Sequence, residues 1–172
     1  MSDAVSSKLS TRVWIMILTG AVIVTLSMGV RQSFGLFLGP LGLELQVDRQ
    51  TFGLIVAGQN LLFGLLQPFV GAWADRHGAG KVAVVGAAVY AVGMAVGATA
   101  ANTLGLAIGF GALVGLAMAG CTFTVILGAV GKIVPADKRT LAFGIVTAGG
   151  SFGQFLGVPP GHGRLGAAGW RG

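Results

Sequence analysis

Five long apolar runs, separated by short polar gaps, limit the possible folds of this 172-residue chain more than any other feature. A run of about 20 apolar residues is long enough to cross the hydrocarbon core of a bilayer as an α-helix. The runs cover about residues 13–38, 51–73, 82–101, 104–128 and 141–158. None alternates apolar and polar residues over the length of a barrel strand, which argues against a transmembrane β-barrel. We therefore predict an all-α membrane protein with five transmembrane helices.

The charge content supports the same class. Only 9% of the residues are charged, whereas a soluble protein carries about 25%. The expected surroundings of the chain are therefore a lipid bilayer. The net charge of +6 would suggest a nucleic-acid partner in a soluble protein. Here the basic residues lie in the gaps between apolar runs, where membrane topology accounts for them, and we expect no nucleic acid.

The distribution of Lys and Arg predicts the orientation, because cytoplasmic loops carry an excess of these residues. We expect residues 1–12 to form a cytoplasmic N-terminal tail, followed by a helical bundle over residues 13–158. This arrangement places seven basic residues on the cytoplasmic side and three on the other. The seven are Lys8, Arg12, Arg76, Lys81, Lys132, Lys138 and Arg139, and the three are Arg49, Arg164 and Arg171.

Arg31 is the one charged residue inside the five apolar runs. An Arg at the middle of a transmembrane helix costs about 2.5–3.5 kcal/mol on insertion scales, so such a residue usually faces a cavity or a partner. No acidic residue lies inside any run to neutralise it. An anionic substrate, such as a carboxylate, would accept two hydrogen bonds from the planar guanidinium. Two alternatives remain: Arg31 snorkels to the outer interface, or it contacts helices outside this chain.

Uncharged polar residues inside the runs complete the predicted substrate-binding set. We select Gln59, Asn60 and Thr122 together with Arg31, although each amide or hydroxyl could equally bind a neighbouring helix. No cluster of Cys, His or carboxylate residues suggests a metal, and no nucleophile–base pair suggests catalysis. We therefore expect neither a cofactor nor a metal, and no enzymatic activity.

The gap between the second and third runs holds the most specific motif, in the segment 71–81. Asp75 and Arg76 are followed by Gly78 and Lys81, with Gly71 four residues before Asp75. A carboxylate at a helix end can pair with cations or cap a neighbouring helix, and glycine permits a tight reversal. The spacing resembles the loop signature of the major facilitator superfamily between helices two and three. The resemblance implies a gating role on the cytoplasmic side. Ala79 and Val82 depart from the family pattern, which usually has basic residues there.

Two other stretches are similar to the same family, namely 29–37 in the first run and 59–68 in the second. They resemble bacterial members grouped with oxalate/formate and monocarboxylate carriers. This resemblance implies a multi-pass protein of the bacterial inner (plasma) membrane that carries a small solute by alternating access.

The family fold has two six-helix halves, and this sequence supplies five spans of the N-terminal half. We expect Pro159 and Pro160 to end the fifth span, and residues 159–172 to form a short polar tail before a sixth helix. The chain is then a fragment of a secondary transporter, and its missing partners are the C-terminal helices. The alternative function is a membrane scaffold or assembly partner without transport.

Overall fold

The structure, a computed structural model, describes residues 9–34 and 45–168, with side chains described up to residue 156. Every regular element in these ranges is a helix, which confirms the all-α class for this part of the chain. The predictions for residues 1–8, for the outer loop around Pro40 and Glu44, and for residues 169–172 lie outside the described residues. In chain order the elements are α1 (Thr11–Gln32), α3 (Arg49–His77), α4 (Ala79–Ala98), α5 (Thr103–Leu106), the π-helical η1 (Ala107–Leu113), α6 (Val114–Cys121), α7 (Phe123–Ile133), the 3₁₀-helical η2 (Ala136–Lys138) and α8 (Arg139–Ala168).

Four helical segments among the described residues are long and apolar enough to cross a membrane. They are Thr11–Gln32, Arg49–His77, Ala79–Ala98 and the composite segment Thr103–Ile133. Their positions agree with the first four predicted spans. The fifth predicted span corresponds to α8, which is not among these four, so five spans remain a prediction.

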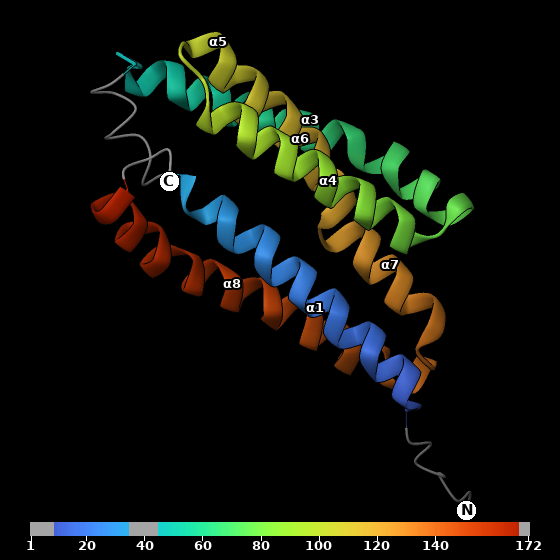
Figure 1. Cartoon of the computed structure of the whole chain (residues 1–172). Helices are drawn as coiled ribbons and strands as arrows, with labels where there is room; N and C mark the ends of the chain where they lie inside the picture. Colours follow the sequence, from blue (N-terminus) through green and yellow to red (C-terminus); the bar gives the residue numbers. More distant parts are fainter. Residues whose placement is uncertain (1–8, 35–44, 169–172) are drawn as a thin grey trace, which may run out of the picture.

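The helices form two groups that α7 connects (Figure 1). On one side α1 and α8 lie next to each other and run in the same direction, and they make the most extensive helix contact of the described chain. On the other side α6 packs against both α3 and α4. The helix α7 continues from α6 and contacts both α1 and α8. The interior of the bundle therefore includes the contacts of α7 with both helix groups.

Glycines allow the closest helix contacts. On the α1–α8 interface, a Cβ on Gly153 would lie 2.7 Å from the carbonyl carbon of Thr25. On the contact between α4 and η1, a Cβ on Gly109 would lie 2.7 Å from the Cα of Gly97. Small residues at such positions let helix backbones approach closely in membranes, where no hydrophobic force drives helices together.

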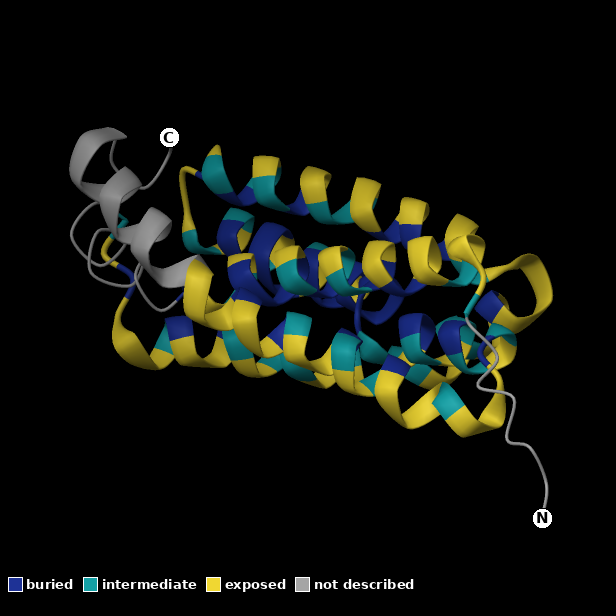
Figure 2. Cartoon of the chain, turned by 90° about the horizontal axis from the view of Figure 1, so that it is seen from below, coloured by how far each residue is buried: buried dark blue, intermediate teal, exposed yellow. Residues whose placement is uncertain are grey.

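The outer surface of the bundle is apolar, while buried residues gather between the helices (Figure 2). Large apolar side chains follow one stripe along α1 and another along α3, with spacings close to multiples of the helical repeat. These stripes are exposed in the described chain and suit contact with lipid or with further helices. They consist of Ile15, Leu18, Val22 and Leu26 on α1, and of Leu54, Leu61, Leu65 and Phe69 on α3.

The fourth span differs from the expected continuous helix over 104–128. It contains the π-helical stretch η1, it breaks at Thr122, and it ends at Ile133. Thr122 has an extended backbone (φ −107°, ψ −171°), so it separates α6 from α7. Beside the break, the hydroxyl of Ser27 on α1 lies 3.0 Å from the carbonyl oxygen of Cys121 and can donate to it. A neighbouring helix thus satisfies a backbone group that the break frees.

The last helix also differs from expectation. Pro159 and Pro160 do not end it, and α8 continues to Ala168. Proline removes a backbone donor and strains the preceding turn. Transmembrane helices accept this because helix neighbours and local adjustments satisfy the freed carbonyls.

Candidate functional site

Arg31 and Asn60 meet between the two helix groups. Arg31 lies in the last turn of α1 and is half-buried. Its Nη2 donates a hydrogen bond to Oδ1 of Asn60 on α3. The Asn60 amide is itself oriented, because its Nδ2 donates to the carbonyl of Val56 at 2.8 Å. Two of the four predicted substrate-binding residues are therefore in direct contact, although they are 29 positions apart in sequence.

The position of Asn60 along α3 can be compared with the thickness of the hydrocarbon core of a bilayer. Asn60 is about 16 Å along the helix from Arg49, and the 29-residue α3 is about 43 Å long. This length exceeds the roughly 30 Å hydrocarbon core by about 13 Å. Even if the whole excess lay on the Arg49 side, Asn60 would still lie inside the core. Binding to Asn60 directs the Arg31 guanidinium to α3, and its contact with a solute stays a prediction.

Gln59 faces a different neighbour from Asn60, because successive helical residues point about 100° apart. It is only 1% exposed, and its Nε2 donates to the carbonyl of Phe110 in η1 at 2.7 Å. Its Oε1 is buried and has no hydrogen-bond partner among the described residues. Gln59 therefore ties α3 to the π-helical stretch and keeps one acceptor available.

Thr122 lies at the break between α6 and α7 and is fully buried. Its Oγ1 has no hydrogen-bond partner among the described residues, and it does not cap α7. Thr122 makes no hydrogen bond with the Arg31–Asn60 pair. The structure thus joins Arg31 to Asn60 and places Gln59 and Thr122 at separate positions inside the bundle.

Tyr90 was not selected from the sequence, although it belongs to the same interior region. It lies on α4, its ring packs against the main core, and its hydroxyl is buried without a hydrogen-bond partner among the described residues. Arg31 and Cys121 are both close enough to interact electrostatically with this hydroxyl. The available sequence signal was that Tyr90 is the single tyrosine of the chain and lies inside an apolar run.

The motif segment 71–81 forms the turn between α3 and α4. Gly78 alone separates the two helices, and its φ of +94° lies in the region that favours glycine. Gly71 lies on α3, and its Cβ position would be 4.0 Å from the Thr124 methyl group on α7. Arg76 and Lys81 are exposed on either side of the turn.

Asp75 pairs with a residue that the motif does not contain. Lys132 at the end of α7 donates from Nζ to Oδ1 of Asp75 at 2.7 Å. The side chains are 59% and 66% exposed for Lys132 and Asp75, so solvent screens the pair. A cation in the last turn of α7 also interacts favourably with the helix dipole. The ion pair links the ends of the second and fourth spans.

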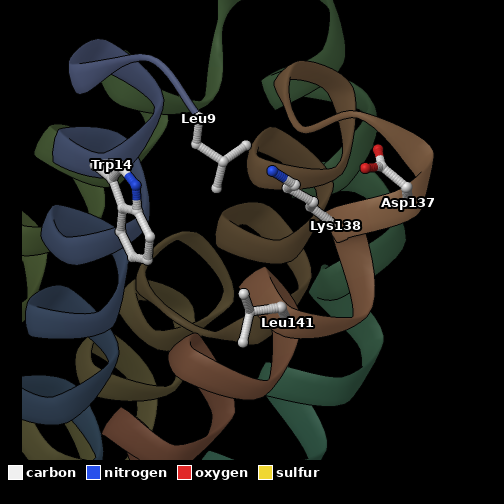
Figure 3. A pocket seen from close by; sticks show the side chains of 5 residues that line it. All are labelled: Leu9, Trp14, Asp137, Lys138 and Leu141. Carbon is white, nitrogen blue, oxygen red and sulfur yellow. The ribbon is translucent and has the colours of Figure 1, made fainter. Parts of the chain in front are cut away.

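A hollow of about 420 Å³ opens at the end of the bundle where α1 begins. In Figure 3, Leu9 and Trp14 lie on the α1 side, and Lys138 and Leu141 lie across from them. The Lys138 ammonium extends toward Leu9. Arg31 is at the other end of α1, so this hollow is separate from the Arg31–Asn60 pair.

Metal-ligating residues do not gather anywhere in the described part of the chain: no group of three or more His, Cys, Asp or Glu residues lies together there. The polar groups inside the bundle are amides, hydroxyls and one guanidinium. Such groups can hold a solute by hydrogen bonds and charge.

Apolar helices of membrane-spanning length, packed through glycine contacts around a few buried polar side chains, define a polytopic α-helical membrane protein. Residues 15–172 match the Major Facilitator Superfamily. The chain belongs to this family, and the resemblance drawn from the segment 71–81 is confirmed.

Two curated relatives are similar to most of the chain. Monocarboxylate transporter 14 of Mus musculus and that of Homo sapiens are each 32% identical over 147 residues. The match covers 83% of this chain but only 28% of each relative. No solved structure matches the chain at a significant level. The relatives are mammalian, so placement in a bacterial inner membrane remains a prediction.

Proposed function

We propose that this chain is the N-terminal part of a secondary transporter that moves a small organic anion by alternating access. The observation that supports this best is the Arg31–Asn60 hydrogen bond inside the bundle. This bond joins Arg31 to a second candidate span, and no carboxylate in any apolar run neutralises the guanidinium. Both relatives are named monocarboxylate transporter 14, which favours a carboxylate as the anion.

The geometry of Arg31 suits a carboxylate. A guanidinium has five N–H donors in a fixed fork, and Asn60 accepts from Nη2. The remaining donors can take a carboxylate through two parallel hydrogen bonds. Asn60 fixes the side chain through its own bond to Val56, which reduces the entropy lost when a ligand binds. The Thr122 hydroxyl can donate to a carboxylate, whereas Oε1 of Gln59 can only accept, for example from a hydroxyl group of the solute.

We further propose that the segment 71–81 acts as a cytoplasmic gate. Asp75 and Lys132 form an exposed ion pair between span ends, and an exposed pair is weak enough to exchange partners. Arg76 and Lys81 lie beside it and are available to helices of the second half. The gate would then open and close by exchanging the partners of these ion pairs, while the helices stay intact.

Replacement of Arg31 by lysine tests the anion site. Lysine keeps the charge but loses the planar fork, so uptake of radiolabelled lactate into proteoliposomes by the complete transporter should fall about tenfold or more. Arg49→Lys is the matched control, because Arg49 is exposed at the start of α3. Equal uptake by the Arg31→Lys and Arg49→Lys variants, both correctly inserted, would remove Arg31 from the site.

The alternative of a membrane scaffold makes a different prediction. A scaffold would migrate in a specific complex on blue-native gels and would show no flux of any carboxylate. A downstream reading frame that encodes further apolar spans would instead support the transporter proposal.

A further inference from the structure

The Tyr90 hydroxyl is an unusual group for its place in the fold. Its oxygen is buried among apolar side chains of the core and has no partner among the described residues. Burial of a hydroxyl without a hydrogen bond is unfavourable. A phenylalanine would fill the same space without this cost. Contacts within the described residues therefore give no reason for an oxygen at this position.

Neighbouring contacts place Tyr90 and Arg31 at the same level along the bundle. Gly86 and Gly93, one turn to either side of Tyr90, approach Cys121 and Val114, with Cβ positions 2.7 Å from the Cys121 sulfur and 3.0 Å from Val114 Cγ2. Tyr90 therefore lies against α6 between these two contacts.

The helix α1 also contacts α6 near the level of Tyr90. Ser27, one turn before Arg31, binds the Cys121 carbonyl at 3.0 Å. Arg31 and Tyr90 thus approach one interior region from α1 and α4, within electrostatic range of each other.

We propose that Tyr90 is a further substrate-binding residue, whose hydroxyl donates a hydrogen bond to the carboxylate held by Arg31. A carboxylate has about four lone-pair sites on its two oxygens. Two accept from the guanidinium, which leaves others for a phenol donor. This inference rests on the proposed anion site at Arg31, and it specifies the ligand as one with an acceptor on the α4 side.

Tyr90→Phe removes the oxygen and keeps the ring. The complete transporter, labelled with ¹⁵N-arginine, would be placed in lipid nanodiscs, and the Arg31 guanidinium signal would be followed by NMR during titration with lactate. The signal is assigned by its loss in Arg31→Lys. We expect lactate to shift this signal, neutral lactamide to leave it unchanged, and Tyr90→Phe to raise the Kd for lactate about tenfold or more.

Thr25→Val is the matched control, because it also deletes one hydroxyl inside the bundle. The Thr25 hydroxyl donates to the Gly149 carbonyl at 2.8 Å, so its loss should lower thermal stability and leave the lactate Kd unchanged. Tyr90→Phe should do the opposite, with stability equal to or above that of the parent chain. An unchanged Kd in Tyr90→Phe, or a loss of stability like that of Thr25→Val, would overturn the assignment of Tyr90.

The titration also separates the two proposals. If lactate does not move the Arg31 signal in the parent chain, the anion site fails and the role of Tyr90 fails with it. If lactate moves the signal equally in the parent chain and in Tyr90→Phe, Arg31 remains in the site and only Tyr90 is removed.

Discussion

Gly153→Ala is expected to force α1 and α8 apart. The added Cβ would overlap the carbonyl oxygen of Thr25 and lie 2.7 Å from both its carbonyl carbon and its Cα. These are backbone atoms of α1, so no side-chain rotation relieves the overlap. The helices must shift or tilt, and the adjacent hydrogen bond from Thr25 to Gly149, 2.8 Å long, is weakened or lost.

The expected magnitude follows from two contributions. Overpacking of a well-packed interior costs about 1–3 kcal/mol. An interhelical hydrogen bond in a membrane is worth about 0.6 kcal/mol on average and up to about 1.7. We therefore expect Gly153→Ala to lower the free energy of unfolding by about 2–4 kcal/mol.

Gly144→Ala is the matched control on the same helix. No atom lies within 4 Å of its Cβ position, so alanine there should be neutral or should add up to about 1 kcal/mol through helix propensity. Both variants would be measured by reversible unfolding in mixed micelles, with helix content as the signal. If the two variants unfold alike, α1 and α8 do not pack in this close contact, and the reasoning is refuted.

Two further predictions concern charged ends of helices. The backbone N–H of Thr51 donates to Asp48 at 2.6 Å and lowers the pKa of this carboxyl below its ordinary 3.8; the stability that it gives α3 is therefore present above pH 3.8 and is lost as the pH falls through the lowered pKa. Thermal unfolding should show a difference between the parent chain and Asp48→Ala at neutral pH that disappears in acid, and a difference that persists in acid would contradict this. For Asp75 and Lys132, a double-mutant cycle of alanine variants should give a coupling of at most about 1 kcal/mol that falls with added salt; a larger or salt-independent coupling would contradict an exposed pair.

Hydropathy located the first four spans well, because transfer free energies add over about 20 residues and single errors matter little. The helix interruptions follow a different rule. Beside the break at Thr122, the carbonyl of Cys121 accepts from Ser27, which is 94 positions earlier. No local pattern in the fourth run reports that contact.

The candidate site divides in the same way. Arg31 could be selected from sequence, since a charge inside an apolar run is costly wherever it points. The sequence does not distinguish its partner from the other polar residues in the runs, and the structure identifies that partner as Asn60. Lys132 was visible only as one basic residue of a loop, because its pairing with Asp75 spans 57 positions.

The unpartnered polar atoms inside the bundle, like the charge of Arg31, are costly to bury in an apolar environment. Gln59, Tyr90 and Thr122 each keep a buried oxygen without a partner among the described residues. Each such oxygen is costly in an apolar interior, and leucine, phenylalanine or valine would fill the same positions without it. Their cost is offset when a solute or water supplies the missing bond. Three such oxygens in one bundle agree with the proposed binding of a polar solute, and the titration of Tyr90→Phe tests one of them.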